Sequence, residues 1–292
     1  MTDSLCEIPR TELHKLRDLY LREWPRYVLA FYTIDNYIKW FEKQPDVKNI
    51  KILALNGDWS DGTYIIVVSR RVIDILITAN NAKRALYLLD YRRKLVLYGF
   101  PVSFKSTVEE LFNQFNLRTR LDNKESHTQV YYLPREKAKD FEISLPLGIN
   151  LKSIEEDSAG IIDNVWSFQH EGSEYFIKLL IRFNPSIGAY TDDGQLIAWC
   201  LTIPLGSLGM LQVKDSYKRQ GLGSILVKAM SKKFANFGYD VCAPVVLGNN
   251  ASKRMFENLG FVENLIREYA TGKQQNQEIP ARNVFTYLFA SS

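Results

Sequence analysis

Residues 211–224 place an apolar strand, a basic pair and two closely spaced glycines in an order that suits binding of a phosphorylated ligand. The stretch ends Lys218-Arg219-Gln220-Gly221-Leu222-Gly223-Ser224 and leads into a helical pattern. A helix start carries unpaired backbone N–H groups and partial positive charge, which favour a bound anion. Glycines let the backbone approach that anion, and the two basic side chains add countercharge. The sequence therefore predicts a pyrophosphate-binding turn.

The same two glycines would also suit an ordinary strand-to-helix turn in which they only allow tight packing. The dinucleotide-binding pattern G-x-G-x-x-G is incomplete, because Val227 and its neighbours are not glycine. The phosphate-loop pattern with Gly-Lys-Ser/Thr is also absent. A second feature is needed to identify the turn.

That second feature follows one helix and one strand later. Asn249 or Asn250 caps a short predicted helix, Phe256 packs inward, and Gly260 ends the helix before Phe261 opens a further strand. Together the two motifs resemble the GCN5-related N-acetyltransferase (GNAT) superfamily. The residues that fill its patterns are Lys218, Gly221, Gly223, Asn249, Ser252, Phe256, Glu257, Leu259, Gly260 and Phe261.

Within that superfamily, the second half of the chain is similar to the glycine N-acyltransferase group. The matching features are Val165-Trp166, Glu171–Glu174, Phe176-Ile177, Arg182–Pro185, Gly194, Trp199, Tyr217, Gly221, Phe237–Tyr239 and Asn249–Ala251. The resemblance implies an α+β (mixed α/β) tandem fold with two mixed, mainly antiparallel twisted sheets flanked by helices. It also implies acyl-CoA or acetyl-CoA as co-substrate and a small amine as acceptor.

In such a fold the sheet would splay open beside the strand ending near Val213. Pantetheine would lie in the split, pyrophosphate would sit on the amides from Arg219 to Ser224, and Asn249 would face the pantetheine arm. The implied cofactor-binding residues are Leu211, Gln212, Val213, Lys218, Arg219, Gln220, Gly221, Leu222, Gly223, Ser224, Asn249 and Phe256.

The catalytic residues depart from the group's pattern. The resemblance places a catalytic glutamate after a glycine on the strand before the turn, where this chain has Ser207 after Gly206, and a tyrosine acid where it has Phe256. Neither side chain can do that proton transfer. Water or the loose candidates Tyr217, Tyr190, Asp192 and Glu171 would have to replace them.

Three functions therefore stay open. The first is an N-acyltransferase that acts on glycine, another amino acid or a small amine. The second is a CoA-binding protein that is catalytically weak or inactive and has a sensing or partner-binding role. The third is an interaction scaffold that has lost the cofactor, which the intact Gly221 and Gly223 argue against.

Helical and strand-like segments alternate along the chain and must position these motifs. The first half predicts helices over 13–24, 34–41, 79–91 and 108–115 and strands over 50–55, 64–68, 94–98 and 128–133. The second half predicts a helix from a capping box at residues 153–156, a helix capped by Ser173, a hairpin over 188–203, a strand over 208–213 and a helix over 222–237.

We place a domain boundary near residue 145, in a polar linker over 134–146. Residues 1–145 would form an N-terminal GNAT-like domain without a cofactor motif, and residues 146–292 the acyl-CoA-binding domain. Residues 80–84 echo 249–254, which could record an internal duplication or arise by chance.

Composition narrows the remaining classes. A hydrophobic content of 46% supports a folded chain, and a net charge of +4 gives no reason to expect nucleic acid. Cys6, Cys200 and Cys242 are too few and too widely spaced for a disulfide framework, and Cys200 and Cys242 read as core residues. No metal site, membrane span or secretory signal is predicted, so we expect an intracellular protein, cytoplasmic or mitochondrial.

Overall fold

The structure is a computed structural model that describes residues 2–68, 72–76, 81–89, 96–101, 105–115, 127–169, 171–263 and 284–289. It divides into two units. Unit 1 comprises Met1–Val130, Val245–Asn250 and Asn264–Ser292, and unit 2 comprises Tyr131–Pro244 and Ala251–Glu263. The boundary near residue 145 remains a prediction about domains.

The described elements follow the same order twice along the chain. The first pass is β1 (Leu5–Glu7), α1 (Leu13–Leu19), α2 (Val28–Lys43), β2 (Ile50–Leu55), β3 (Tyr64–Val68), β4 (Val72–Leu76), α3 (Asn81–Tyr87), β5 (Val96–Pro101), α4 (Lys105–Gln114) and β6 (His127–Leu133). The second pass is β7 (Ile149–Lys152), α6 (Ala159–Asp163), α7 (Ser173–Phe183), β8 (Ser186–Thr191), β9 (Leu196–Ile203), β10 (Ser207–Val213), α8 (Leu222–Asn236), β11 (Val241–Val246), α9 (Asn250–Asn258) and β12 (Val262–Glu263). Helix α5 (Arg135–Lys139) joins the passes, and β13 (Val284–Phe289) follows them.

The strands form two sheets, as predicted. One has the order β1-β2-β3-β4-β5-β13-β6-β11, with β12 also paired to β6, and the other has the order β10-β9-β8-β7. The shorter sheet is antiparallel throughout, whereas β4 and β5 of the longer sheet pair in parallel. The prediction of two mainly antiparallel sheets flanked by helices is confirmed, and of the two only the longer sheet is mixed in the described chain.

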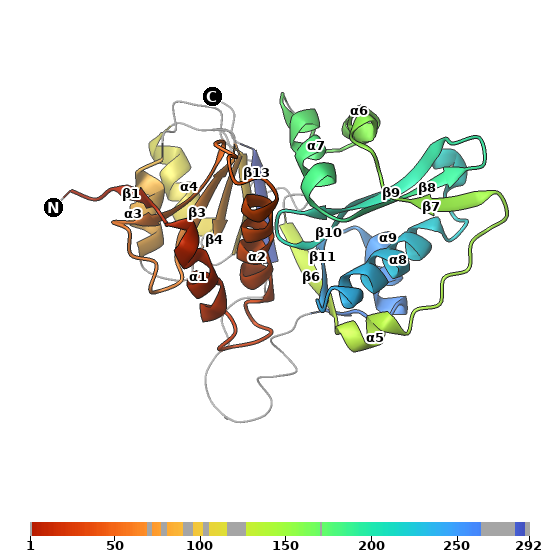
Figure 1. Ribbon diagram of the computed structural model, residues 1–292. Coiled ribbons are helices and arrows are strands. Elements are labelled where there is room, and N and C mark those ends of the chain that lie inside the picture. Colours follow the sequence, from red (N-terminus) through yellow and green to blue (C-terminus); the bar gives the residue numbers. More distant parts are fainter. Residues whose placement is uncertain are drawn as a thin grey trace. The chain divides into compact units, whose positions relative to one another are not determined.

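In unit 2, α6 and α7 lie on one face of the four-stranded sheet and α8 lies on the other (Figure 1). On the face of α8 that meets the sheet, a buried apolar side chain recurs at every fourth residue: Leu222, Leu226, Met230 and Phe234. Strand β9 is buried along its whole length because helices cover both of its faces. This packing fixes the position of β10 and the start of α8.

Several predicted boundaries are wrong. The capping box at residues 153–156 does not start a helix: a short 3-10 helix begins at Glu156, whose carboxylate instead accepts two hydrogen bonds from Arg182, Nε–Oε1 2.8 Å and Nη2–Oε2 2.6 Å. Ser173 does not cap α7, because Gly172 occupies that position and the Ser173 hydroxyl donates to Asp163 instead. In both cases the side chain that the local pattern predicts as a helix cap instead forms a hydrogen bond with a residue elsewhere in the chain.

The polar linker also contains a helix that the sequence did not predict. Helix α5 begins after Pro134, and the buried carboxylate of Asp240 accepts hydrogen bonds from the backbone N–H of Arg135 (3.0 Å) and the hydroxyl of Tyr132 (2.7 Å). The side chains of Lys228 and Lys232 on α8 donate to backbone carbonyls just beyond α5. Because these partners are remote in sequence, no local signal indicates the helix.

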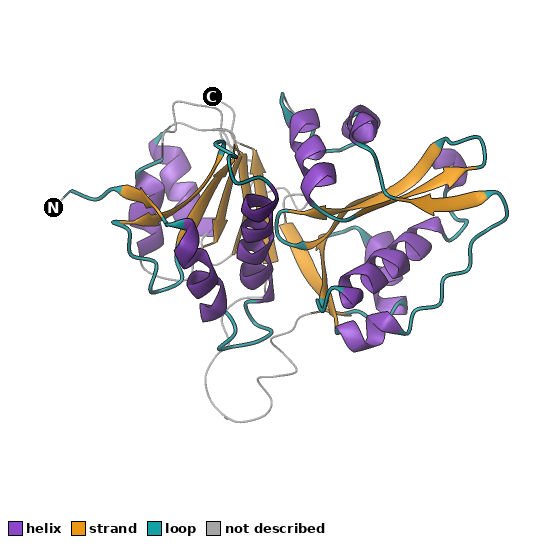
Figure 2. Cartoon of the chain, viewed as in Figure 1, coloured by secondary structure: helices purple, strands orange, loops and turns teal. Residues whose placement is uncertain are grey.

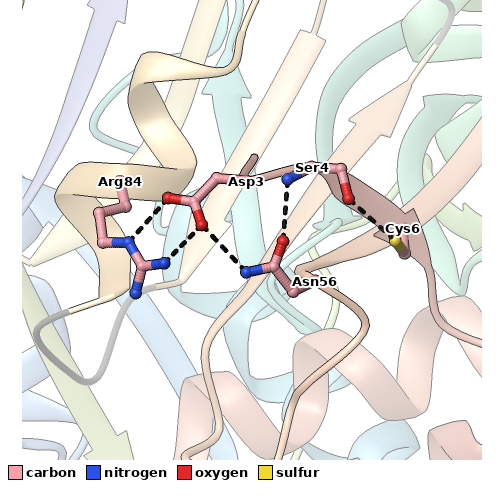
Figure 3. Close-up of polar contacts among 5 residues, drawn as sticks. All are labelled: Asp3, Ser4, Cys6, Asn56 and Arg84. Atoms are coloured by element: carbon pink, nitrogen blue, oxygen red, sulfur yellow. Dashed lines mark hydrogen bonds and ion pairs between the residues drawn. The ribbon is translucent and has the colours of Figure 1, made fainter. Parts of the chain in front are cut away.

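At the N-terminus, the side chain of Asp3 holds residues 2–7 against α3 (Figure 3). Its carboxylate accepts hydrogen bonds from Arg84 Nε (2.8 Å) and Nη2 (2.5 Å) and from Asn56 Nδ2 (3.1 Å). Hydrogen bonds from Arg84 and then Asn56 lower the pKa of Asp3. Arg84 belongs to the segment that echoes residues 249–254.

The two similar sequence segments, residues 80–84 and 249–254, do not occupy equivalent places in the fold. Helix α3 holds the place in the first pass that α8 holds in the second, whereas the echoed residues 249–254 lead into α9. The order of elements is therefore duplicated (Figure 1), and both copies combine helices with strands (Figure 2), but the short sequence match does not align the two copies. Among the described residues, no helix has the length and apolar character needed to cross a membrane.

Strand β13 generates a first prediction. It pairs with β5 through five residue pairs and with β6 through three, so it is an interior strand of the longer sheet. A chain ending at residue 283 would expose both neighbours. Each lost hydrogen bond removes about 0.5–1.5 kcal/mol, and together they approach the roughly 5–15 kcal/mol that stabilises a whole domain.

We expect limited proteolysis to cut unit 1 of that shortened chain while unit 2 survives as a fragment. A chain ending at residue 289, which keeps β13, is the control and should resist cleavage like the full chain. Equal protease resistance and equal melting temperature for all three chains would contradict the structural role of β13.

Candidate functional site

Strand β10 forms one edge of the four-stranded sheet, and among the described strands it pairs only with β9. The register shifts between Gly209, which faces Leu201, and Gln212, which faces Trp199. Met210 lies inside this bulge with a left-handed φ of 49°. A Cβ at Gly209 would come within 2.5 Å of Ile203 Cγ2, so a side chain at this position would clash with β9.

Strand β11 joins the other sheet, so within the described chain no strand pairs with the free edge of β10 at residues 211–213. This is the split in the sheet that the family resemblance implies. Leu211, Gln212 and Val213 are all half-buried there. Their proposed contact with pantetheine stays a prediction.

The turn over residues 218–224, which the sequence analysis predicts as a phosphate-binding turn, has left-handed backbone conformations immediately before a helix start. After a 3-10 turn over Asp215–Tyr217, Arg219 and Gly221 both have left-handed φ angles, 62° and 78°, and α8 begins at Leu222. No side chain in the described structure caps this helix start. Because the first turn of a helix has no intrahelical acceptors, the N–H groups of residues 222–224 remain without partners inside the helix.

The two glycines of the turn are not equivalent. A Cβ at Gly221 would meet nothing within 4 Å, so the left-handed backbone is what requires glycine there. The space beside the Gly221 Cα is therefore open. A Cβ at Gly223 would lie 3.4 Å from Met255 Sδ and 3.9 Å from Val213 Cγ2, which are ordinary van der Waals distances, so neither the packing nor the backbone requires glycine at this position.

The two basic residues also differ. Lys218 Nζ lies 2.6 Å from Asp215 Oδ1, and this hydrogen bond lowers the pKa of Asp215. Arg219 is exposed and has no ion-pair partner among the residues that the structure describes. The exposed Gln220 donates a long hydrogen bond, 3.5 Å, to the carbonyl of Ser216. Arg219 is therefore the countercharge that remains available to a ligand.

The second motif packs inward, as the sequence predicts. The Phe256 ring is buried, stacks on Tyr131 with 5.9 Å between centroids, and meets Phe261 edge-on at 5.0 Å. The hydroxyl of Tyr131 donates to Glu263 Oε2 at 3.3 Å, and burial followed by the charges of Glu263 and Glu257 raises its pKa. Phe256 thus belongs to the apolar interior beneath α9.

Asn249 lies in the exposed turn before α9, where its backbone N–H donates to the carbonyl of Val246 at 3.0 Å. Its contact with the pantetheine arm remains a prediction. Ser207 opens β10 and is fully buried, and its hydroxyl has no hydrogen-bond partner in the described part of the chain. A serine in that position is part of the interior and cannot exchange protons with a substrate.

The residues that the sequence analysis offered as alternative proton-transfer groups do not lie together in the structure. Asp192 accepts a hydrogen bond from Asn150 at the turn of the β8–β9 hairpin, at the opposite end of β9 from Ser207. Tyr190 is half-buried in β8, where burial raises its pKa. Glu171 precedes α7, and His170 lies outside the described residues. Tyr217 alone of these adjoins the phosphate turn along the chain.

The cysteines in the sheet are interior residues, as predicted. Cys200 and Cys242 are fully buried. Burial raises the pKa of the Cys200 thiol to about 12 and raises that of Cys242 well above its ordinary value. The bulge at Met210 is the main feature that the sequence analysis missed, and the glycine at 209 inside an apolar strand was the available signal.

Comparison with known proteins supports the resemblance. Residues 186–270, which include both motifs, match the family described as FR47-like protein. A glycine N-acyltransferase-like protein from Mus musculus is 25% identical over 172 residues, which cover 59% of this chain and 53% of that protein. The chain therefore spans about half the length of this curated relative.

Two solved structures share the fold over nearly the whole chain. A Drosophila protein has a TM-score of 0.81 at 21% identity and covers 99% of both chains. A tandem GNAT protein from the clavulanic acid biosynthesis pathway has a TM-score of 0.57 at 11% identity and covers 99% of this chain and 98% of its own. The predicted tandem GNAT fold and the resemblance to glycine N-acyltransferase-like proteins are confirmed.

The burial of the sheet cysteines generates a second prediction. With a pKa of about 12, Cys200 carries only about one thiolate in 10⁴ molecules near pH 8. We expect iodoacetamide to alkylate the exposed Cys6 and to leave Cys200 and Cys242 unmodified in the folded protein. Peptide mass spectrometry gives the readout, and the unfolded protein, in which all three should react, is the control. Rapid labelling of Cys200 would show an accessible nucleophile beside β10.

Proposed function

We propose that this chain is an N-acyltransferase that moves an acyl group from acyl-CoA to the amine of glycine, another amino acid or a small amine. The observation that carries the proposal is the uncapped start of α8, reached through Gly221, next along the chain to the unpaired edge of β10. The FR47-like match over residues 186–270 and the glycine N-acyltransferase-like relative support it.

In this proposal the pyrophosphate binds the amides from Arg219 to Ser224, with Arg219 as countercharge. Pantetheine runs along the backbone of Leu211–Val213 in the manner of an added strand, and Asn249 contacts its arm. The buried ring of Phe256 supports α9 from beneath. Most of the recognition then comes from backbone groups, which act at a helix start and a strand edge.

The reaction joins the amine nitrogen to the thioester carbonyl carbon and breaks the carbon–sulfur bond, so that CoA leaves as its thiolate. The bulge interrupts the regular cross-strand pairing at Met210 and Leu211, and in this proposal a backbone N–H of the bulge polarises the thioester carbonyl. Holding both reactants in line supplies a further large share of the acceleration. Neither contribution needs a titratable side chain.

A second candidate function is a CoA-binding protein that does not catalyse transfer. The burial of Ser207 and Phe256 favours it, because neither position can exchange protons with a substrate. Turnover of acyl-CoA with a broad panel of amines separates the two candidates, since both require cofactor binding.

Cofactor binding is tested by thermal unfolding with acetyl-CoA. A ligand at 100 times its Kd stabilises the fold by about 2.7 kcal/mol. We expect Gly221→Leu to abolish the shift, because it strains the left-handed backbone and fills the open space beside the helix start.

Gly238→Leu is the matched control. Gly238 lies at the other end of α8, has a similar φ of 83° and also has open space around its Cβ. Both variants should lose comparable stability without ligand, about 1–2 kcal/mol for the unfavourable φ, while only Gly221→Leu loses the response to acetyl-CoA. A shift that survives in Gly221→Leu would place the cofactor elsewhere.

A further inference from the structure

We infer that the acceptor is a weakly basic amine that is substantially neutral near pH 7, such as a peptide α-amine or an aromatic amine. This inference rests on the proposed acyltransferase function, because it concerns the second substrate of the same site. The observation behind it is that the described side chains around β10 offer no base that could remove a proton from an amine bound there.

Within the described chain, strand β10 and the two elements packed most closely against it, β9 and α8, carry no carboxylate and no histidine. Strand β10 has no titratable side chain, and β9 has only the buried thiol of Cys200. Helix α8 carries Lys228, Lys232 and Lys233, of which the first two donate to the carbonyls of Glu142 and Phe141. Protonated lysines that donate to carbonyls cannot take up a further proton, and Lys233, whose pKa is lowered by burial, is the group on α8 that the pH profiles below test.

The carboxylates of the neighbouring helices are held by partners of their own. On α9, Glu257 lies 3.7 Å from Lys253, which also binds Glu263 at 3.0 Å. On the opposite face of the sheet, the buried Asp163 accepts hydrogen bonds from Ser173 and Gln169. Further along that face, two ion pairs join Glu174 to Lys178 and Glu156 to Arg182.

Without a protein base, only the neutral form of the amine reacts. A peptide α-amine has a pKa of about 7.7–8.0 and a lysine side chain one of about 10.4. Near pH 7.4 about a quarter of the first is neutral but only about one part in 10³ of the second. Near pH 7.4 the neutral, reactive fraction of the α-amine is therefore roughly 300-fold larger than that of the lysine amine. The lower intrinsic nucleophilicity of the weaker base reduces this difference in part.

The proton balance needs no group from the protein. The neutral amine attacks the carbonyl carbon, the carbon–sulfur bond breaks, and the CoA thiolate leaves. The proton released by the amide nitrogen goes to water, and the thiolate takes up a proton from water if the pH requires it. The buried ring of Phe256 takes no part in either transfer.

The test compares the N-terminal α-amine of a dipeptide, an aniline and the ε-amine of an Nα-blocked lysine, each with acetyl-CoA. At about pH 7 we expect kcat/KM for the dipeptide to exceed that for the blocked lysine at least tenfold. For the dipeptide and the blocked lysine, kcat/KM should rise about tenfold per pH unit and level off at the conjugate-acid pKa of the amine, near 8 for the dipeptide and above 10 for the lysine. The aniline, already neutral, should show a flat profile.

A common inflection at one pH for all amines would reveal a titrating group of the protein and overturn the inference. So would preference for the lysine amine near neutral pH. Ser207→Ala, which removes only a buried hydroxyl, should keep the amine-dependent profiles, and a displaced inflection would assign the proton transfer to Ser207.

The outcome also separates this inference from the proposed function. An acetyl-CoA thermal shift without turnover of any weakly basic amine would overturn the inference and leave cofactor binding in place. The absence of any acetyl-CoA shift would remove the proposed function itself.

Discussion

The free edge of β10 is the constraint on which the candidate site depends. Strand β11, which comes next after α8, joins the other sheet instead of pairing with β10. The backbone of residues 211–213 therefore keeps hydrogen-bonding groups that no described strand uses. Buried or half-buried backbone groups need partners, so an extended ligand alongside this edge would satisfy them. The bulge at Met210 and the turn at Gly221 set the two ends of that edge.

The first pass of the chain uses the same order of elements without leaving an edge open. Its corresponding strands, β4 and β5, pair in parallel through Val72 with Val96 and Ile73 with Leu97. The sheet then continues through β13 to β6. At these two pairs the backbone of β4 is taken up by β5, so the repeated order of elements does not imply a repeated binding site. This contrast is consistent with the prediction that only the second half carries a cofactor motif.

Sequence reasoning succeeded where structure is set locally. The apolar rhythm of α8, the glycine after it and the β8–β9 hairpin were predicted, because helix periodicity and turn chemistry act between near neighbours. The form of the turn at Gly221 was predictable for the same reason. The pairing of Lys218 with Asp215 and the stacking of Tyr131 on Phe256 were not predicted. The stacking and the place of β13 depend on residues far apart in the chain, which no single-sequence pattern records.

The buried start of β10 also limits how proton chemistry could be supplied. The Ser207 hydroxyl finds no hydrogen-bond partner within the described chain, so a carboxylate in the same place would find no donor either. Burying an unpaired charge costs far more than burying a hydroxyl, and the group would become protonated instead. A working base therefore requires a more open start to β10 as well as an acidic side chain. In the proposed function, the turn at Gly221 and the edge of β10 bind the cofactor through backbone groups. Cofactor recognition would then not depend on that change, and the binding and proton-transfer parts of the site would be physically separable.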